Sequence, residues 1–482
     1  MKLHDILKNK VIFYLFSRYG TYGLQFLCSL LIASKLGPYY MGIWGFILLI
    51  MQYFQQLHFG IANSFNVFYV HNLNNIQEQN NYTANSLVLV GILALLAGSS
   101  FLIYGISDLS QDIKFPIHTY WEQIALIVML QYFYQFLIAL FRVKNKLLIV
   151  AFCQSVVVIF NFFSVLFCSG EVLIKFLIWG YLIGYTLSVV LAFSTNVFPP
   201  ILSCKVNIIY QKNIIKKGLL LFLYNSCFFF IIISVRTMIS WNYSIEEFGL
   251  FTFAFTLAHA FMLLLESLSF VIFPKVIAKL SSSDIQNVQQ SIQMYRSCYI
   301  VSANILIYSA LVLFPLFLLI LPKFSAALSA IELIALTILM HSNSVGYTDL
   351  LIARNKEKIS ALTSLTALTV NCLFAYFFIK IWHVSFYNVI FATMISYFGF
   401  VLTVAYCGMQ TFKRVSIFQT FGIVFPYRIV IPFSVAIFIC VNNMNIYLPL
   451  PLLLYMLLNR KYIRNTYDVF LKMLNRPDVI NL

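Results

Sequence analysis

Long apolar runs recur along nearly the whole of this chain. Parts of two of them read FILLIMQYF at 46–54 and SVVVIFNFFSVLF at 155–167. A helix needs about 20 mainly apolar residues to cross the hydrocarbon core of a bilayer. The strands of a membrane barrel instead alternate apolar and polar positions over about 10 residues. Because these runs are continuous and do not alternate, they predict transmembrane helices.

The composition indicates that lipid surrounds most of the chain. Of 482 residues, 61% are hydrophobic and only 10% are charged. A soluble domain carries about 25% charged residues, and a soluble protein this apolar would lack the polar groups to cover its surface. We therefore expect an all-α polytopic membrane protein with no soluble domain.

The apolar runs predict about 14 transmembrane helices joined by short connections. The predicted spans are 11–34, 41–65, 84–106, 120–141, 147–168, 172–194, 218–240, 248–273, 295–321, 325–351, 358–380, 385–408, 420–441 and 445–459. The last is the shortest, with Pro449 and Pro451 near its start. No connection between spans is long enough to fold into a domain of its own.

The positions of the basic residues predict the topology. With the N-terminus in the cytoplasm, 23 of the 31 Lys and Arg residues fall on the cytoplasmic side and five on the other side. Positive charge favours the cytoplasmic side of a membrane protein, so both termini are expected there. The net charge of +16 is then mostly a topology signal, and we expect no nucleic-acid partner.

Two short segments repeat at a fixed distance along the chain. GIWGF at 42–46 matches GLFTF at 249–253, an offset of 207 residues. Each begins the second helix of a group of six. We therefore expect an N-terminal six-helix half at 1–204, a C-terminal six-helix half at 205–412, and two appended helices with a basic cytoplasmic tail at 413–482. Parallel repeats of this kind are a known transporter plan, with the substrate site between the halves.

The sequence lacks the common motifs of redox, metal-binding and nucleotide-binding sites. The nine cysteines form no C-x-x-C pair, and the seven histidines show no metal-ligand spacing. The chain also lacks the glycine-rich loop with lysine that binds nucleotide phosphates. We therefore expect no enzyme activity, no cofactor and no bound metal.

Polar residues form a stripe on the first predicted span. Tyr14, Arg18, Tyr22, Gln25 and Ser29 fall on one helical face. Ionisable groups at membrane depth are costly and usually face a water-filled cavity. Arg18, Tyr22 and Gln25 are therefore candidate substrate-binding residues. The alternative is that Arg18 extends to the cytoplasmic interface.

A second arginine lies within the seventh predicted span. Arg236 is near its outer end, and Asn225 lies three turns earlier on the same face. Both are candidate substrate-binding residues in a transport lumen. The alternative for Arg236 is extension to the outer interface, toward Trp241.

The eighth predicted span carries its own polar stripe, with Thr252, Thr256, His259 and Glu266. His259 can titrate near neutral pH, and both His259 and Glu266 are candidates for ion coupling. Three interpretations of Glu266 stay open: pairing with an arginine, binding a coupling ion, or bonding to a neighbouring helix.

Four segments resemble Wzx-type polysaccharide flippases of the multidrug/oligosaccharidyl-lipid/polysaccharide exporter superfamily. They are RYGTYGLQFLCSLLIASKLGPYYMGIWGF at 18–46, FGIANSF at 59–65, the stretch 235–276 that contains FGLFTF, and LLIARNKEK at 350–358. The family often has an aspartate near the outer half of the seventh helix, where this chain has Arg236.

The resemblance implies a flippase for a polyprenyl-pyrophosphate-linked oligosaccharide, such as an O-antigen or capsule repeat unit, in the bacterial inner membrane. Arg18 and Arg236 would contact the pyrophosphate in alternating-access states, because arginine matches phosphate geometry. By resemblance to the lipid II flippase, the two last helices would guide the lipid tail. Membrane lipid, a polysaccharide polymerase and chain-length proteins are the implied partners.

Two other functions stay open from the sequence. One is a cation-coupled multidrug exporter of the same superfamily, a branch that typically has twelve spans and acidic residues in the lumen. The other is a membrane polysaccharide polymerase, although such enzymes usually carry a large outer loop and the outer loops here are short.

Overall fold

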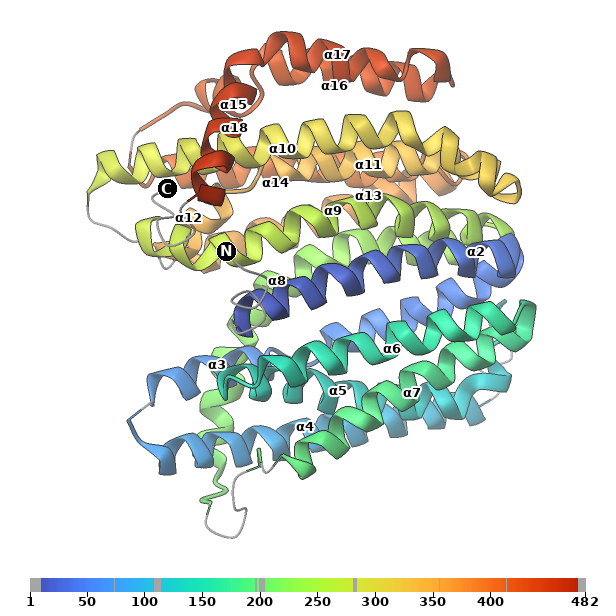
Figure 1. The fold of residues 1–482 in the computed structure, drawn as a ribbon, viewed down its shortest axis with the longest axis vertical. Coiled ribbons are helices and arrows are strands. Elements are labelled where there is room, and N and C mark those ends of the chain that lie inside the picture. The colour runs from blue at the N-terminus through green and yellow to red at the C-terminus, as the bar shows by residue number, and fades with distance from the viewer. Residues whose placement is uncertain are drawn as a thin grey trace. The chain divides into compact units, whose positions relative to one another are not determined.

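The computed structural model (Figure 1) describes eight stretches of the chain: residues 10–72, 74–107, 114–195, 197–198, 204–280, 284–354, 356–412 and 414–475. Within them, the side chains of 10–16, 18, 220–221, 224–225, 228, 262–278 and 470–475 lie outside the description. The described residues form helices and no strand. This confirms the prediction of an all-α polytopic membrane protein.

The chain forms two compact units. Unit 1 comprises residues 1–226 and 244–249, and unit 2 comprises 227–243 and 250–482. Helix α8 begins in unit 1 and ends in unit 2. The helices of unit 1 are α2 (Lys10–Gln56), α3 (Ile61–His71), α4 (Ile76–Ile106), η2 (His118–Tyr120), α5 (Trp121–Val143), α6 (Leu147–Phe167), α7 (Gly170–Ser194) and the start of α8 (Ile208–Asn242).

Unit 2 contains the end of α8 and all later helices, apart from the first turn of α9. These are α9 (Ile245–Leu280), α10 (Ile285–Ile320), η4 (Pro322–Ala327), α11 (Leu328–Ser342), α12 (Tyr347–Ala353), α13 (Glu357–Lys380), α14 (Ile390–Met409), α15 (Ile417–Val424), α16 (Tyr427–Val441), η5 (Asn445–Tyr447), α17 (Pro449–Leu458) and α18 (Arg460–Asn475).

Most residues of each predicted span are helical, but the helices divide differently, because turns interrupt the second span at 57–60 and the tenth at 343–346. In the part of the chain that the structure describes, nine helices are long and apolar enough to cross a membrane, and α15 with α16 would make ten if that bent pair is one span. The first two predicted spans lie in one bent element, and Phe229–Asn242 and Asn445–Leu458 are apolar helices of only 10–17 residues. The chain is a multi-pass membrane protein.

A sharp bend divides α2 where the sequence predicts a turn. Gly37 has a φ of 68° and ψ of 175°, and Pro38 follows it. Glycine adopts this backbone conformation without the steric penalty of a side chain. Proline can open the following helix because the first turn does not need its N–H. The α2 element is therefore two helices, one on each side of Gly37.

The repeated segments contact each other through their glycines, within unit 1. A Cβ atom on Gly42 would clash with the carbonyl oxygen of Ile245, and one on Gly249 would clash with that of Pro38. Ile245 follows Pro38 by the same 207 residues that separate the two glycines. The contact is thus reciprocal, as at an interface between symmetry-related copies. Small residues allow this close backbone approach between membrane helices.

Aromatic contacts join the helices of unit 1, in which α5 packs against both α4 and α7. The Trp121 ring stacks on Phe101 with centroids 4.3 Å apart, and its Nε1–H donates to the Phe101 carbonyl at 2.7 Å. The indole therefore buries apolar area while its one donor is satisfied.

Two lysines secure the end of α7 in unit 1. Lys144 donates to the Val197 carbonyl at 2.5 Å and Lys146 to the Thr195 carbonyl at 2.7 Å. Burial, with a smaller contribution from Lys146, lowers the pKa of Lys144 from its ordinary value. Carbonyls at a helix end attract cations, so these contacts connect the start of α6 to the end of α7.

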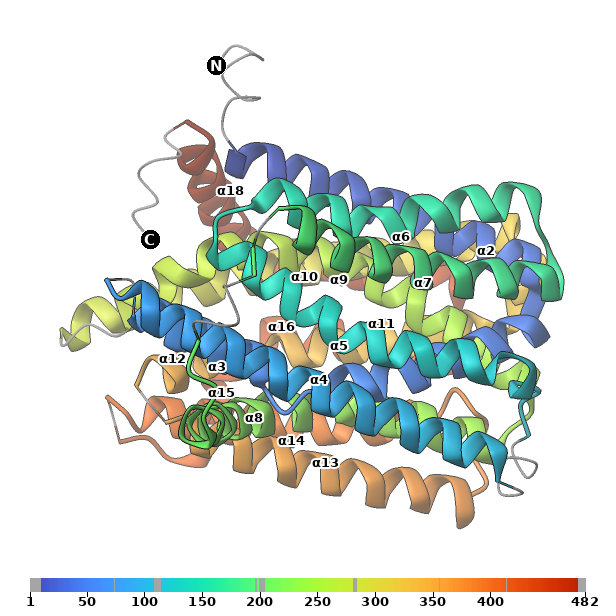
Figure 2. The same ribbon diagram turned by 90° about the horizontal axis from the view of Figure 1, so that it is seen from below.

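One buried asparagine connects three helices in the core of unit 2. The buried Asn371 side chain on α13 donates to the Ile231 carbonyl at 2.7 Å and to Ser234 at 2.9 Å, both on α8. Its oxygen accepts a hydrogen bond from Thr393 on α14 at 3.1 Å. Figure 2 shows α13 and α14 side by side. Such polar contacts join membrane helices that have no hydrophobic drive to associate.

Candidate functional site

A polar pocket of about 250 Å³ lies among the helices of unit 1. We call it the tyrosine pocket, and its walls come from α2, α5, α6 and α7. Its lining consists of Ser17, Thr21, Tyr22, Gln25, Tyr134, Ala151, Gln154, Val157, Val158, Tyr181 and Tyr185. The structure therefore brings the predicted residues Tyr22 and Gln25 together in one pocket.

The stripe on α2 supplies one wall of the tyrosine pocket. Ser17, Thr21 and Gln25 are four residues apart, so they share one face of the helix. The Thr21 hydroxyl donates to the Ser17 carbonyl at 2.8 Å and lies 2.7 Å from the Ser155 hydroxyl on α6. Thr21 thus links α2 to α6, while the Gln25 side chain remains exposed.

The opposite wall is aromatic. Tyr134 on α5 stacks on Tyr185 on α7 with ring centroids 4.5 Å apart, and Tyr181 meets Tyr185 edge to face at 5.8 Å. Tyr185 is buried. No charged side chain is among the lining residues of the described pocket. Hydroxyl, amide and aromatic groups without charge suit a neutral ligand that is rich in hydroxyl groups.

In unit 2, Arg236 is almost completely buried, with 1% of its surface exposed. Its guanidinium group lies over the Phe255 ring on α9, 4.8 Å from the centroid. Trp241, which lies further along α8, is by contrast 77% exposed. A guanidinium over an aromatic face gains cation–π attraction, which is larger where water is excluded.

His259 lies near Arg236, and a second histidine lies near His259. The His259 ring stacks on Phe255 with centroids 4.2 Å apart and is close enough to Arg236 to interact with it electrostatically. His341 on α11 interacts electrostatically with His259, and its Nε2 lies 3.2 Å from the Ser344 hydroxyl. The three residues form an arginine–histidine cluster that joins α8, α9 and α11.

One nitrogen of this cluster is open to a ligand. The buried Nδ1 of His259 has no hydrogen-bond partner among the side chains that the structure describes. A buried polar atom of this kind usually has a partner. The arginine–histidine cluster can therefore supply both a cation and a hydrogen-bonding imidazole to an anionic group.

Three predicted site residues cannot be placed. The side chains of Arg18, Asn225 and Glu266 lie outside the described residues, although the backbone at all three positions is helical. Among the residues that the structure does describe, no group of three or more His, Cys, Asp or Glu side chains is arranged to hold a metal ion.

The sequence did not single out four lining residues of the tyrosine pocket: Tyr134, Gln154, Tyr181 and Tyr185. Tyr181 and Tyr185 are four residues apart on α7 and share a face, but tyrosine is also frequent at membrane interfaces. The polar stripe on the eighth predicted span points to His259, and only the packing of α9 and α11 shows that His341 interacts with it.

No protein-family model matches the sequence, and no curated protein is significantly similar to it. Among solved structures, an inward-facing multidrug resistance MATE family transporter of the MOP superfamily matches with a TM-score of 0.67 at 12% identity, over 83% of this chain and 95% of that one. The lipid II flippase MurJ in an inward closed conformation matches with a TM-score of 0.65 at 13% identity, over 98% and 100%. The chain therefore shares the helical fold of these two structures.

A third structure supports the same conclusion about the fold. A eukaryotic MATE transporter matches with a TM-score of 0.52 at 10% identity, over 85% of this chain and 96% of that one. The matched structures include a multidrug resistance transporter and a lipid II flippase. At such low identity the likeness concerns the arrangement of helices, so the substrate has to be argued from this chain's own residues.

Proposed function

We propose that this chain is a flippase that moves a polyprenyl-pyrophosphate-linked oligosaccharide, such as an O-antigen or capsule repeat unit, across the bacterial inner membrane by alternating access. The main support is the extent of the match with the lipid II flippase, which covers 98% of this chain, against 83% for the inward-facing MATE transporter. The difference between these two coverages, converted to residues of this chain, is close to the length of the appended segment 413–482.

The substrate has two polar parts, and the two units offer matching chemistry. Among the described residues, the lining of the tyrosine pocket has hydroxyl, amide and aromatic groups and no charged group, which suits sugar rings and their hydroxyl groups. The arginine–histidine cluster offers a buried guanidinium. Arginine binds phosphate oxygens in a bidentate, charge-assisted manner. Each unit would thus contribute a different contact to the same substrate.

The arginines have the leading role in this proposal. Arg236 would contact the pyrophosphate in one state of the transport cycle and Arg18 in another, while the lipid tail stays in the bilayer. Gln25, Tyr22 and Asn225 would contact the substrate beside them. His259 and Glu266 would be the candidates for coupling to an ion.

A multidrug exporter is the alternative, supported by the TM-score of 0.67 with the MATE transporter. Exporters of cationic drugs need acidic groups to bind them, and the described part of unit 2 buries one, Glu332, together with the arginines Arg236 and Arg296. A polysaccharide polymerase stays a weaker alternative. We propose the polymerase and chain-length proteins as partners of the flippase in the same assembly pathway.

The test is complementation in cells that lack their own flippase for the repeat unit, with surface glycan as the readout. The wild-type chain should restore surface glycan, and Arg18→Ala should abolish it while membrane insertion stays normal. Efflux of a cationic dye is measured in the same cells. Dye efflux without restored glycan would contradict the flippase and support the exporter, and normal glycan with Arg18→Ala would remove Arg18 from the mechanism.

A further inference from the structure

Unit 2 contains a larger cavity, separate from the arginine–histidine cluster. Its volume is about 500 Å³, and α10 supplies the largest part of its wall, with further residues from α12, α14, α15, α16, α17 and α18. Two arginines line it, Arg296 on α10 and Arg428 on α16, together with Gln293, Tyr455, Asn459 and Tyr462. We call it the arginine cavity. Unlike a packed apolar core, this cavity is lined by two cationic side chains.

The Arg296 side chain is held in place by backbone carbonyls. Its Nη1 donates to the Asn343 carbonyl at 2.8 Å and to the Val345 carbonyl at 2.7 Å, and its guanidinium lies 4.0 Å from the centroid of the Tyr347 ring. Both hydrogen bonds use one nitrogen, and a guanidinium has five N–H donors. Arg296 is thus fixed in position while donors on its other nitrogens remain for a ligand.

Arg428 is fixed by stacking. Its guanidinium lies 3.4 Å from the centroid of the Tyr462 ring on α18, and the Asn459 side chain donates to the Arg428 carbonyl at 3.1 Å. Its buried Nε has no hydrogen-bond partner among the described residues. Burying a donor without a partner is unfavourable. An acceptor from outside the chain would remove that cost.

The surroundings of the arginine cavity favour an anion. Arg428 and Ile429 belong to the first turn of α16, a helix of 15 residues, and a helix N-terminus carries positive partial charge. No Asp or Glu is among the residues that line the cavity. Asp349 interacts with Arg296 electrostatically from outside the lining. Two arginines against one such carboxylate leave a net positive charge.

The cavity also borders a change in surface character. The helices α15 and α16 expose large apolar side chains, among them Phe418 at 89% and Tyr427 at 70%. Helix α18, which contributes Tyr462, exposes Arg460, Lys461 and Arg464. In a membrane protein, exposed apolar residues contact lipid tails, and basic residues beside them lie at the level of the headgroups. The cavity therefore lies at headgroup level.

We propose that the arginine cavity binds the phosphate headgroup of an anionic membrane phospholipid. The two guanidinium groups and the start of α16 bind the phosphate, and the apolar lining, which includes Ile300 and Val301, contacts the adjoining part of the lipid. The lipid would tie α16 and α18 to α10. This proposal is independent of the transported substrate and holds if the flippase proposal fails.

The test is lipid binding to the delipidated full-length chain in detergent, measured by native mass spectrometry. The probes are phosphatidylglycerol, phosphatidylcholine and inorganic pyrophosphate. Arg428→Gln should weaken phosphatidylglycerol binding about tenfold, the loss expected for one charge-assisted contact. Arg464→Gln is the matched control, because it removes an exposed charge from α18 outside the cavity, and its binding should stay within about twofold of wild type.

A second variant covers the case in which Arg428→Gln does not fold. Gln293→Glu places a negative charge in the lining at an exposed position that tolerates substitution, and it should also weaken phosphatidylglycerol binding. Unchanged binding by folded Arg428→Gln or Gln293→Glu overturns the proposal. So does an equal loss with Arg464→Gln, equal binding of phosphatidylcholine, or complete displacement of the lipid by pyrophosphate, which would indicate a site for free phosphate.

Discussion

The two units differ in the charge of their polar interiors. In unit 1 the tyrosine pocket has a neutral lining of hydroxyl, amide and aromatic groups. In unit 2, Arg236 is buried near His259, and Arg296 and Arg428 line a second hollow. The repeated segments at 42–46 and 249–253 contact each other through their glycines within unit 1. Among the described side chains, the polar pocket of unit 1 is therefore neutral, whereas the polar interior of unit 2 contains buried arginines.

The difference in charge suggests that the two units recognise different chemical groups. A neutral, hydroxyl-rich group has no need of ionised partners, whereas a phosphate needs cations where water is scarce.

The largest effect is expected where the repeated glycines meet. Gly249→Leu would force a side chain into the carbonyl of Pro38 and toward the backbone nitrogen of Gly42. Overpacking of this kind costs at least about 1–3 kcal/mol, and backbone atoms have little freedom to move away. We expect loss of monodisperse protein in size-exclusion chromatography. Gly20→Leu is the control, because a Cβ there meets nothing within 4 Å; equal expression of both variants would disprove the close approach.

Removing the buried charge of unit 2 should have the next largest effect. Arg236→Gln should reduce translocation of the lipid-linked oligosaccharide about 100-fold, since the loss of a buried charged contact costs about 3 kcal/mol. Arg236→Lys should restore only part of it, because lysine lacks the planar fork. Thermal stability of each variant separates a transport defect from misfolding. A stable Arg236→Gln protein with wild-type translocation would contradict the role of the cationic interior.

A smaller effect is expected in the neutral pocket. Gln25→Leu should raise the apparent KM for the glycosylated substrate about fivefold to tenfold, the value of one hydrogen bond, with kcat little changed. Ser29→Ala is the control. Ser29 lies on the same helix, but its hydroxyl donates to the backbone carbonyl of Gln25, and it is not among the lining residues of the pocket. If the two variants behave alike, Gln25 does not contact the glycan.

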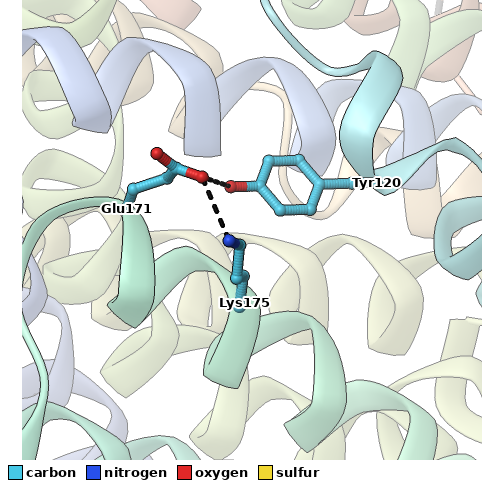
Figure 3. A network of polar contacts seen from close by, with 3 residues as sticks. All are labelled: Tyr120, Glu171 and Lys175. Carbon is cyan, nitrogen blue, oxygen red and sulfur yellow. Dashed lines mark hydrogen bonds and ion pairs between the residues drawn. The ribbon is translucent and has the colours of Figure 1, made fainter.

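The smallest effect is expected at an ion pair that belongs to neither interior. Glu171 accepts a hydrogen bond from Tyr120 at 3.3 Å and pairs with Lys175 at 3.2 Å (Figure 3). Both charged side chains are more than half exposed, and exposed pairs contribute about 0–1 kcal/mol. Lys175→Gln should therefore change the melting temperature by only a degree or two and leave translocation unchanged. A large loss of transport would show that this exposed ion pair takes part in translocation.

Much of the fold could be predicted from residue patterns alone. Each apolar run became helix because a backbone in lipid must satisfy its own hydrogen bonds. The Gly37–Pro38 turn was also predictable, since these residues break a helix. The pattern did not predict the break in the thirteenth predicted span. This continuous apolar segment divides into two helices, α15 and α16, with an angle of 70° between them. Pro426 at the junction is the local signal for that break.

The candidate site was predicted only in part, for a reason specific to tertiary contacts. Tyr22 and Gln25 share a helical face, and periodicity finds such residues within one helix. Tyr134 and Tyr185 come from two other helices, so only packing brings them to the same pocket. Arg296 appeared to be a cytoplasmic flanking charge, but it bonds to carbonyls at Asn343 and Val345, far along the chain. The basic tail likewise contains a helix, α18, whose Tyr462 covers Arg428.

The most direct test is translocation by the purified chain in liposomes with three lipid substrates. These are the polyprenyl-pyrophosphate oligosaccharide, the same carrier without sugar, and a polyprenyl oligosaccharide without phosphate. If the neutral and cationic interiors recognise different parts of one substrate, only the first should cross rapidly, and the protein should be required. Rapid transport of a substrate that lacks either part, or no transport of the complete one, would contradict the account.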